Sequence, residues 1–364
     1  MRDCCVPWRS TASSSRGRAM SLGNTHGPLT PADLRDYAAR RSLDDLRAEA
    51  NAACEAVWGN RVFVRGLVEI SNHCAMDCLY CGIRCSNQRI ARYRLFPEEI
   101  VALAREGYAR GIRTFVLQGG EDPAFSTDDY CRMVEGVRKA TGGEAAVALS
   151  LGIRPRSHYA AFKNAGADRY LLRFETSDEA LHTHLRGGVP YARRLQALFD
   201  LKELGFEVGS GFMTGLPGES EATFYNNILL CRELELDMVG VGPFIPHPDT
   251  PLRNAPAPSL EPTLQAVALV RLLLPYANIP ATTAAGSMDP LGREKMLTSG
   301  ANVLMPNLSP TAAKQRYRIY PGKICIDESS AVCLEDARKR VASVGKVLSF
   351  ERGDSKSVEL RRAC

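Results

Sequence analysis

Short apolar runs of strand length alternate with helical patterns along most of the chain, and this alternation limits the possible folds more than any other feature. Strands separated by helices predict a parallel sheet. Eight such runs spread over about 245 residues match the usual size of a closed (β/α)8 TIM-type barrel. A doubly wound open sheet is the alternative, but cysteines stand where its phosphate-binding glycines are expected. The runs are residues 63–71, 114–120, 146–152, 169–175, 207–215, 238–246, 278–286 and 301–307.

The ends of the chain differ from this pattern. Residues 1–30 are rich in Arg and Ser and poor in acids, which is a feature of organelle transit peptides. A disordered tail, or a true start at Met20, is the simpler interpretation and the one we expect. Thr30 followed by Pro31 is a typical helix start. We therefore predict N-terminal helices over residues 31–62, one barrel domain with a closing C-terminal segment over 63–342, and a C-terminal tail over 343–364.

Composition excludes several classes of protein. No apolar run approaches the roughly 20 residues that span a bilayer, so we expect no membrane partner. Lys and Arg number 46 against 41 Asp and Glu, and a net charge of only +5 argues against nucleic-acid binding. The start of the chain lacks an apolar signal-peptide core, and most of the 12 cysteines are scattered singly. Reduced thiols fit a cytoplasmic protein, which is the location we expect.

Three cysteines follow the first predicted strand directly. Cys74, Cys78 and Cys81 have the spacing C-x3-C-x2-C, and thiolates are the usual ligands of iron–sulfur clusters. Three ligands on one loop would leave one iron of a 4Fe–4S cluster open to a reactant, as in metal sites that keep a position free. A structural zinc site usually needs a second, distant C-x2-C pair, which is missing here. A closed cluster with Cys85 as fourth ligand stays an alternative.

Polar, Gly and Pro residues gather after the predicted strands, at the end of a barrel that carries the active site. Ordinary loop composition explains the glycines, but it does not explain Arg173 and Glu175 at the end of an apolar run. Arg169 lies four residues before Arg173, so the two side chains share a face of the strand. Two cations inside a barrel would need anions. Pairing of Arg169 with a neighbouring acid is the alternative.

The cysteine loop, with aromatic Tyr80 before the last cysteine, resembles that of the radical S-adenosylmethionine (SAM) enzymes. Within that superfamily, further stretches are similar to the HydE family of FeFe-hydrogenase maturases, and the resemblance covers about residues 35–340. The stretches that carry it are residues 71–74, 77–82, 116–123, 165–173, 241–251, 279–283 and 320–325.

The resemblance implies the cofactors and partners. One 4Fe–4S cluster on the three loop cysteines would donate an electron to SAM and release a 5′-deoxyadenosyl radical. The substrate would be a cysteine-bearing iron carbonyl cyanide made by the maturase HydG, and the product would pass to the maturase HydF. A reduced electron donor is also required.

The resemblance also implies site residues. Tyr80 would lie near the adenine, while Arg173, Glu175 and Arg194 would hold the amino acid part of SAM. The same part of SAM would contact the segment after the second predicted strand and the end of the third, namely Gln118, Gly119, Gly120, Glu121 and Ser150. A substrate and anion cavity is implied at Arg169, Thr282 and Thr283, with Met305 and Tyr317 near the reaction centre and Arg169 among the catalytic residues.

Some members of the family carry a second cluster on a C-terminal C-x7-C-x2-C pattern. Here Cys325 and Cys333 keep the first spacing, but Asp336 occupies the third position. Two thiolates and a carboxylate make a poor iron–sulfur site, so we predict no second cluster, or at most a labile one.

Two other functions stay open. The cysteine loop alone does not separate a maturase from a methylornithine synthase-like mutase or a biotin synthase-like sulfur-inserting enzyme. A non-enzymatic metal-binding interaction protein is the more distant alternative, supported only by a pI near 8.6 and a basic loop.

Overall fold

The computed structural model describes residues 29–363. Helices α1 (Pro31–Ala39) and α2 (Leu43–Trp58) confirm the predicted helical start. The Thr30 hydroxyl accepts a hydrogen bond from the Asp33 N–H, and the Asp33 carboxylate accepts one from the Thr30 N–H, a capping box that fixes where α1 begins. Ser42 caps α2 in the same way. The expectations for residues 1–28 lie outside the described residues.

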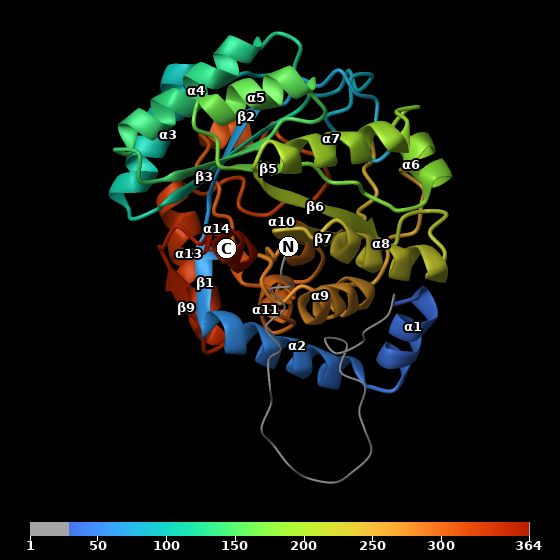
Figure 1. Ribbon diagram of the computed structural model, residues 1–364. Helices are drawn as coiled ribbons and strands as arrows, with labels where there is room; N and C mark the ends of the chain where they lie inside the picture. Colours follow the sequence, from blue (N-terminus) through green and yellow to red (C-terminus); the bar gives the residue numbers. More distant parts are fainter. Residues whose placement is uncertain (1–28, 364) are drawn as a thin grey trace, which may run out of the picture.

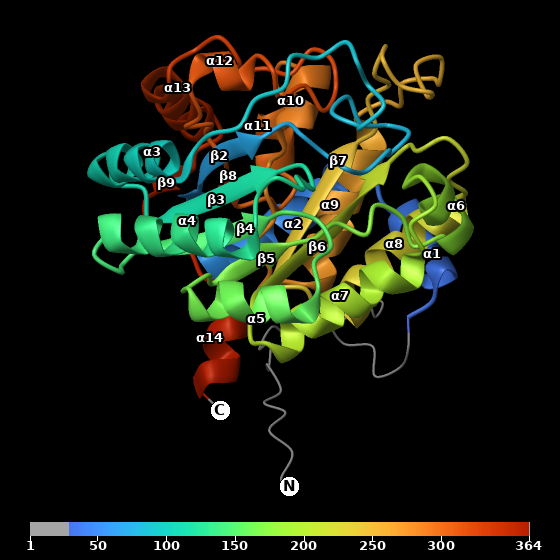
Figure 2. The ribbon, with the colours of Figure 1, turned by 90° about the horizontal axis from the view of Figure 1, so that it is seen from above.

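Six parallel strands form the main sheet in sequence order, as the alternating pattern predicts. Each strand is followed by a return through at least one helix, so every strand ends at the same edge of the sheet (Figures 1 and 2). The strands are β2 (Gly66–Ser71), β3 (Thr114–Gly119), β4 (Ala146–Ser150), β5 (Arg169–Leu171), β6 (Glu207–Thr214) and β7 (Met238–Pro243).

The rest of the barrel differs from the prediction. The first apolar run divides at Arg65: β1 (Arg61–Val64) pairs with β8 (Val303–Leu304) and β9 (Val347–Ser349) in a separate three-stranded sheet. Residues 278–286, predicted as a strand, make only single bridges, between Met238 and Asn278 and between Pro280 and Val303. A third bridge joins Leu67 to Asn307. Single bridges therefore continue the parallel order from β7 round to β2, in a barrel-like arrangement without eight regular strands.

Two features of residues 278–286 explain why no strand forms there. Pro280 has no N–H to donate to a neighbouring strand. Thr282 then accepts a hydrogen bond from the Ala285 N–H and starts α10 (Thr283–Met288). The apolar run is therefore interrupted after a few residues, and its second half is helical.

Helices surround the sheet (Figure 1). Their inward faces are apolar and join one continuous core with the sheet. No helix in residues 29–363 is both long and apolar enough to cross a membrane. The remaining helices are α3 (Pro97–Ala109), α4 (Thr127–Ala140), α5 (Arg156–Asn164), α6 (Glu179–Leu185), α7 (Tyr191–Glu203), α8 (Glu221–Glu233), α9 (Glu261–Leu273), α11 (Gly292–Leu297), α12 (Thr311–Lys314), α13 (Ser330–Ser343) and α14 (Lys356–Ala363).

The C-terminal segment is part of the fold, and its prediction as a tail was wrong. Strand β9 pairs with β1, and the residues after it lie across the beginnings of the barrel strands. The Arg352 carbonyl accepts a hydrogen bond of 2.7 Å from Thr114 at the start of β3, and the Ser355 N–H donates one of 3.2 Å to Glu207 at the start of β6. These contacts cover the end of the barrel opposite the cysteine loop.

Candidate active site

The loop that carries the three cysteines is held by backbone hydrogen bonds to three other segments. The Ala75 N–H donates to the Glu121 carbonyl at 2.9 Å, beyond the end of β3. The Leu79 N–H donates to Leu185 at 2.9 Å, and the Gly82 N–H donates to Ile319 at 3.0 Å. The loop therefore lies over the carboxyl ends of the strands, where a barrel carries its active site.

The thiols of this loop suit a multinuclear cluster. Cys78 is buried, and Cys74 and Cys81 are partly buried. The Cys74 sulfur accepts N–H donors from Met76 and Glu121, each at 3.4 Å. Burial raises the pKa of all three thiols, so a bound metal would be needed to keep them as thiolates. The donor set fits a 4Fe–4S cluster with one open iron.

Close approach of β3's end to the cysteine loop requires glycine at position 120. A Cβ atom there would lie 2.1 Å from the His73 carbonyl oxygen and 2.7 Å from the Cys74 Cβ. Two residues after Gly120, the Asp122 carboxylate accepts hydrogen bonds from the Arg94 guanidinium on both oxygens, at 2.7 and 2.9 Å. The pair fixes the turn that touches the cluster loop.

A group of buried charged side chains beside the loop leaves polar atoms without partners. Arg173, Arg186 and Arg194 each have at least one guanidinium nitrogen that is buried and makes no hydrogen bond, and the Glu175 Oε2 atom has only an ion pair, with Arg173. Arg194 is only 2% exposed. Buried polar groups normally have partners, so the free nitrogens of Arg186 and Arg194, beside the Arg173–Glu175 ion pair, fit a zwitterionic ligand. The amino acid part of SAM carries both an ammonium and a carboxylate, and these residues could hold it.

Glu175 adopts a backbone conformation that is unusual for a residue with a side chain. Its φ is +68°, a region that costs a non-glycine residue free energy. Two hydrogen bonds to β6 hold it there: the Glu175 N–H donates to Gly211, and its carbonyl accepts from Met213, both at 3.0 Å. The Arg173 guanidinium lies 3.2 Å from the Glu175 carboxylate. The alternation of Arg173 and Glu175 in the sequence therefore corresponds to an ion pair on a strained piece of backbone next to the site.

Arg186 connects the predicted residues but was not predicted itself. It donates to the Tyr80 hydroxyl at 3.2 Å and to the Glu121 carboxylate at 3.4 Å. Its charge also acts on the pKa of Cys78, together with those of Glu175 and Arg194. The sequence signal was the pair of glycines that follows Arg186, because two glycines in a row indicate a tight loop. In the structure both glycines have positive φ, and loops of this kind often carry ligand contacts.

Several predicted residues line the interior above the sheet. Gln118 and Ser150 are neighbours in the register of β3 and β4, and Gln118 donates to the Tyr317 hydroxyl at 3.3 Å. Tyr317 is buried, which raises the pKa of its hydroxyl, and negative charge on Cys74 or Cys81 raises that pKa further. Met305 packs against inward-facing residues of three strands, which are Leu67, Val116 and Ala148. Thr282 and Thr283 lie elsewhere on the rim, at the start of α10.

The structure does not bring Arg169 to this site, and its prediction as a catalytic and substrate residue was wrong. Arg169 is the first residue of β5 and bonds Glu207 at 2.8 Å, Thr114 at 2.9 Å and the Asp354 carboxylate. Four residues along a strand span about 13 Å. Arg169 and Arg173 share a face, but they lie at opposite ends of the barrel. Arg169 forms ion pairs with the acids Glu207 and Asp354, and pairing with neighbouring acids was the alternative interpretation of this residue.

Cys85 and the C-terminal cysteine pattern make contacts of their own. Cys85 is exposed, and its thiol contacts the Asp77 carboxylate. Asp336, the third position of the C-terminal pattern, binds Arg293 at 3.0 Å and Arg340 at 2.8 Å. Its carboxylate is therefore already used, and Glu328 is the acid that lies near Cys325 and Cys333.

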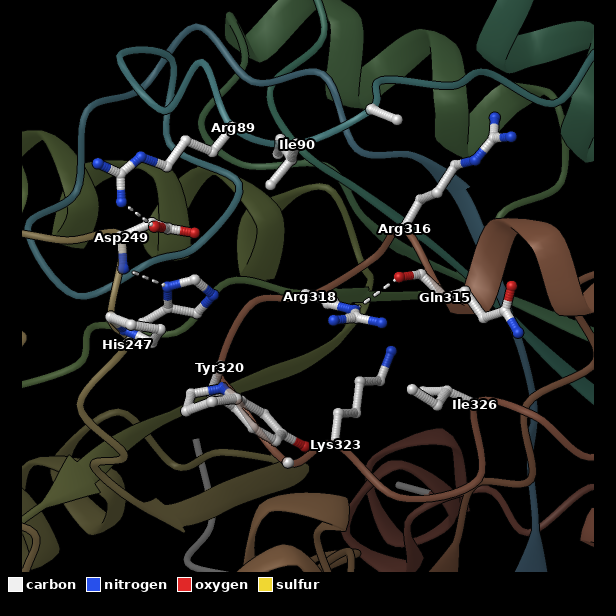
Figure 3. A pocket seen from close by; sticks show the side chains of 14 residues that line it. Arg89, Ile90, His247, Asp249, Gln315, Arg316, Arg318, Tyr320, Lys323 and Ile326 are labelled. Carbon is white, nitrogen blue, oxygen red and sulfur yellow. Dashed lines mark hydrogen bonds and ion pairs between the residues drawn. The ribbon is translucent and has the colours of Figure 1, made fainter.

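A cavity of about 500 Å³ opens beside the cluster loop (Figure 3). Arg89 and Asp249 form an ion pair of 2.9 Å on one side, and Arg318 and Lys323 project from the other (Figure 3). The wall touches the loop directly, because a Cβ atom on Gly82 would lie 2.1 Å from the Arg318 carbonyl oxygen. The residue after Cys81 therefore packs against the segment that forms this wall of the cavity.

Comparison with known proteins identifies the class. The radical SAM superfamily model matches residues 68–231, and the model of the biotin and thiamin synthesis associated domain matches residues 241–324. The crystal structure of methylornithine synthase has a TM-score of 0.78 and 24% identity, covering 92% of this chain and 97% of that one. A structure of HydG gives a TM-score of 0.75 and 19% identity, covering 92% and 74%. Those two likenesses show the fold alone, whereas the match to the superfamily model indicates a radical SAM enzyme.

Sequence relatives narrow the class further. The chain is 47% identical over 300 residues to the [FeFe] hydrogenase maturase subunit HydE of Thermotoga maritima, covering 82% of this chain and 85% of the relative. It is 29% identical over 281 residues to 3-methylornithine synthase of Methanosarcina acetivorans, covering 76% and 79%. The chain belongs to the HydE family of radical SAM enzymes.

Proposed function

We propose that this enzyme acts in the assembly of the diiron unit of FeFe hydrogenase, on a cysteine-bearing iron carbonyl cyanide. HydG would supply this substrate, HydF would receive the product, and a reduced donor would supply electrons. The observation that carries the proposal is the 47% identity to HydE over 82% of the chain. The similarity to methylornithine synthase is weaker, at 29%.

We propose cluster ligation by Cys74, Cys78 and Cys81. A 4Fe–4S cluster held by these residues would supply the electron that turns SAM into a source of a carbon-centred radical. Tyr80 would lie against the adenine, where Arg186 holds its hydroxyl. The turn Gly119–Gly120–Glu121 brings backbone groups next to the loop, and the glycine at 120 permits that approach.

The unpaired groups beside the loop have distinct proposed roles. Arg194 would bind the SAM carboxylate through its two free nitrogens, as a guanidinium fork suits. Glu175 would accept a hydrogen bond from the SAM ammonium, with Gln118 and Ser150 as polar neighbours. Arg173 would orient Glu175 through the 3.2 Å ion pair. Each residue would fix the reacting carbon relative to the cluster, because positioning is the protein's main contribution when a cofactor supplies the chemistry.

We place the substrate between the sheet and the rim. Tyr317 and Met305 face the interior there, and Thr282 with Thr283 offers hydroxyls at the rim. Met305 packs against apolar residues of the interior, and such a lining would help to keep water from a reactive radical. An anionic iron complex would meet cations on its way through the cavity at Arg316 and Arg318.

Turnover with three substrates tests the proposal. The reconstituted enzyme, SAM and a reductant are incubated with the iron–cysteine complex, with lysine or with dethiobiotin, and 5′-deoxyadenosine and products are quantified. We expect product only from the iron–cysteine complex. Conversion of lysine to methylornithine, or of dethiobiotin to biotin, would instead assign the chain a mutase or sulfur-insertion activity.

A further inference from the structure

Two cysteines outside the cluster loop lie side by side. Cys325 is in the loop that lines the cavity wall, and Cys333 is in the first turns of α13. Their sulfur atoms and a Glu328 carboxylate oxygen all lie within 4.8 Å of one another. The Cys333 thiol donates a hydrogen bond to the Cys325 sulfur. Cys325 is partly exposed, whereas Cys333 is 3% exposed.

Each sulfur has its own cation. Arg293 Nη2 lies 3.7 Å from the Cys325 sulfur, and Lys314 Nζ lies 3.7 Å from the Cys333 sulfur. Both cations are buried, and Lys314 is fully so. The hydrogen bond from Cys333, with the charge of Arg293, lowers the pKa of the Cys325 thiol against the effect of burial. The acids Glu328 and Asp336 oppose this shift, and Asp336 is itself neutralised by Arg293.

This arrangement favours thiol chemistry over metal binding. A divalent cation bound by the two sulfurs would be repelled by Arg293 and Lys314, one at each ligand. The same two charges stabilise a thiolate, which is the reactive form of cysteine. A partly exposed thiolate with a buried thiol in contact is the arrangement of an attacking and a resolving cysteine.

We propose that Cys325 and Cys333 form a redox-active dithiol that closes to a disulfide by exchange with a low-molecular-weight disulfide. The Cys325 thiolate attacks one sulfur of the small disulfide and releases a small thiolate. Cys333 then loses its proton and attacks the Cys325 sulfur, which releases the second small thiolate; that proton and the one that Cys325 lost on ionising are taken up by the two leaving thiolates. The protein loses two electrons and two protons, and the small disulfide becomes two thiols.

Lys314 supports the second step. While Cys325 is a thiolate, the hydrogen bond that Cys333 donates and the nearby negative charge raise the pKa of Cys333. Once Cys325 is bonded to the small thiol, that negative charge is gone. Lys314 then faces Cys333 without a competing thiolate and favours its ionisation.

Closure would tie α13 to the wall of the cavity. Lys323, two residues before Cys325, forms an ion pair with buried Glu69 of β2 and donates to the Tyr317 carbonyl at 3.1 Å. The Ile324 N–H donates to Ser287 at 3.3 Å. The segment between the dithiol and the proposed reaction centre is therefore continuous and hydrogen-bonded, so a disulfide would fix the position of that wall.

Peptide mass after equilibration tests the proposal. The cluster-loaded enzyme is incubated anaerobically in buffers with varied ratios of glutathione to glutathione disulfide, quenched in acid, alkylated and digested. We expect the fragment containing both cysteines to lose two hydrogens as the ratio falls. In Cys333→Ser a glutathione adduct should accumulate on Cys325. In Cys325→Ser the fragment should stay a free thiol, and Cys131→Ser on α4 should behave like the wild type.

The effect of Arg293 on the reactivity of Cys325 gives a second test. Arg293→Met should slow alkylation of Cys325 by iodoacetamide at pH 7 about tenfold and move the midpoint of its pH dependence upward, because the thiolate loses its partner. Absence of the disulfide in wild-type protein at every ratio would overturn the proposal. So would zinc, or iron beyond one cluster, that is lost in both Cys→Ser variants, because the residues would then be metal ligands.

Discussion

Replacing Arg194 should separate ligand binding from folding. Arg194 is 2% exposed, and its Nε and Nη2 atoms make no hydrogen bond within the described chain. Burial, with the neighbouring charge of Arg186, lowers the pKa of Arg194 to about 10. A buried cation without partners costs free energy in the protein alone. Binding of a carboxylate to Arg194 should offset that cost, and so contribute to the affinity for SAM.

Arg194→Met should therefore change SAM affinity and protein stability in different ways. Loss of one partner of a buried, hydrogen-bonded charge pair costs about 2–5 kcal/mol of binding, so Arg194→Met should weaken SAM binding by about 30-fold or more. The apoprotein should unfold at the same temperature as the wild type or higher, because an unpaired buried charge has been removed. Calorimetric titration of cluster-loaded protein and thermal unfolding of apoprotein measure the two quantities.

Arg271 supplies the matched control. It is equally buried but donates to the carbonyls of Gly300, Pro275 and Ala277 and to the Asn302 side chain, at 2.7–3.0 Å. Arg271→Met should lower stability by about 3 kcal/mol or more, since several buried acceptors lose their donors. SAM affinity of its folded fraction should not change. If Arg194→Met destabilised the apoprotein as much as Arg271→Met and left SAM binding intact, Arg194 would be a structural residue.

Three further outcomes are expected. Gly120→Ala should abolish iron loading without unfolding the barrel, because its Cβ would lie 2.1 Å from the His73 carbonyl oxygen; iron content and circular dichroism measure this. Arg169→Met should lower the unfolding temperature but leave the KM for SAM unchanged in the folded fraction, since Arg169 lies at the opposite end; an unchanged unfolding temperature would contradict this. Burial opposes ionisation of Asp122, yet the hydrogen bonds from Arg94 and Ser71 lower its pKa, so its stabilisation of the apoprotein should be present at pH 7 and lost below about pH 4. The stability difference between wild type and Asp122→Asn should therefore shrink on acidification, and a constant difference would refute the assignment.

Local sequence patterns predicted the parts of the site that lie at the ends of regular strands. The cysteine spacing predicted a loop that the structure places over the strand ends, and the alternation of Arg173 with Glu175 predicted charged side chains that the structure places beside that loop. Both depend on residues close in sequence. Arg186 was missed because it lies in a loop, where no periodicity indicates which way a side chain points.

Long-range packing explains the errors. Periodicity places Arg169 and Arg173 on one face but says nothing of their depth in the barrel, so Arg169 was assigned to the wrong end. The C-terminal residues 343–364 are polar and short of apolar pattern, yet they supply β9 and the contacts around Asp354. Residues 278–286 are apolar, but Pro280 and the cap at Thr282 prevent a strand.

Reconstitution of hydrogenase activity tests the central claim most directly. Apo-hydrogenase, HydF, HydG, SAM and a reductant are combined without a HydE protein, and hydrogen evolution is measured after adding this enzyme. We predict that the wild-type protein restores hydrogen evolution and that Cys78→Ala does not. Failure of the iron-loaded wild type, in an assay where Thermotoga maritima HydE restores activity, would contradict the proposed function.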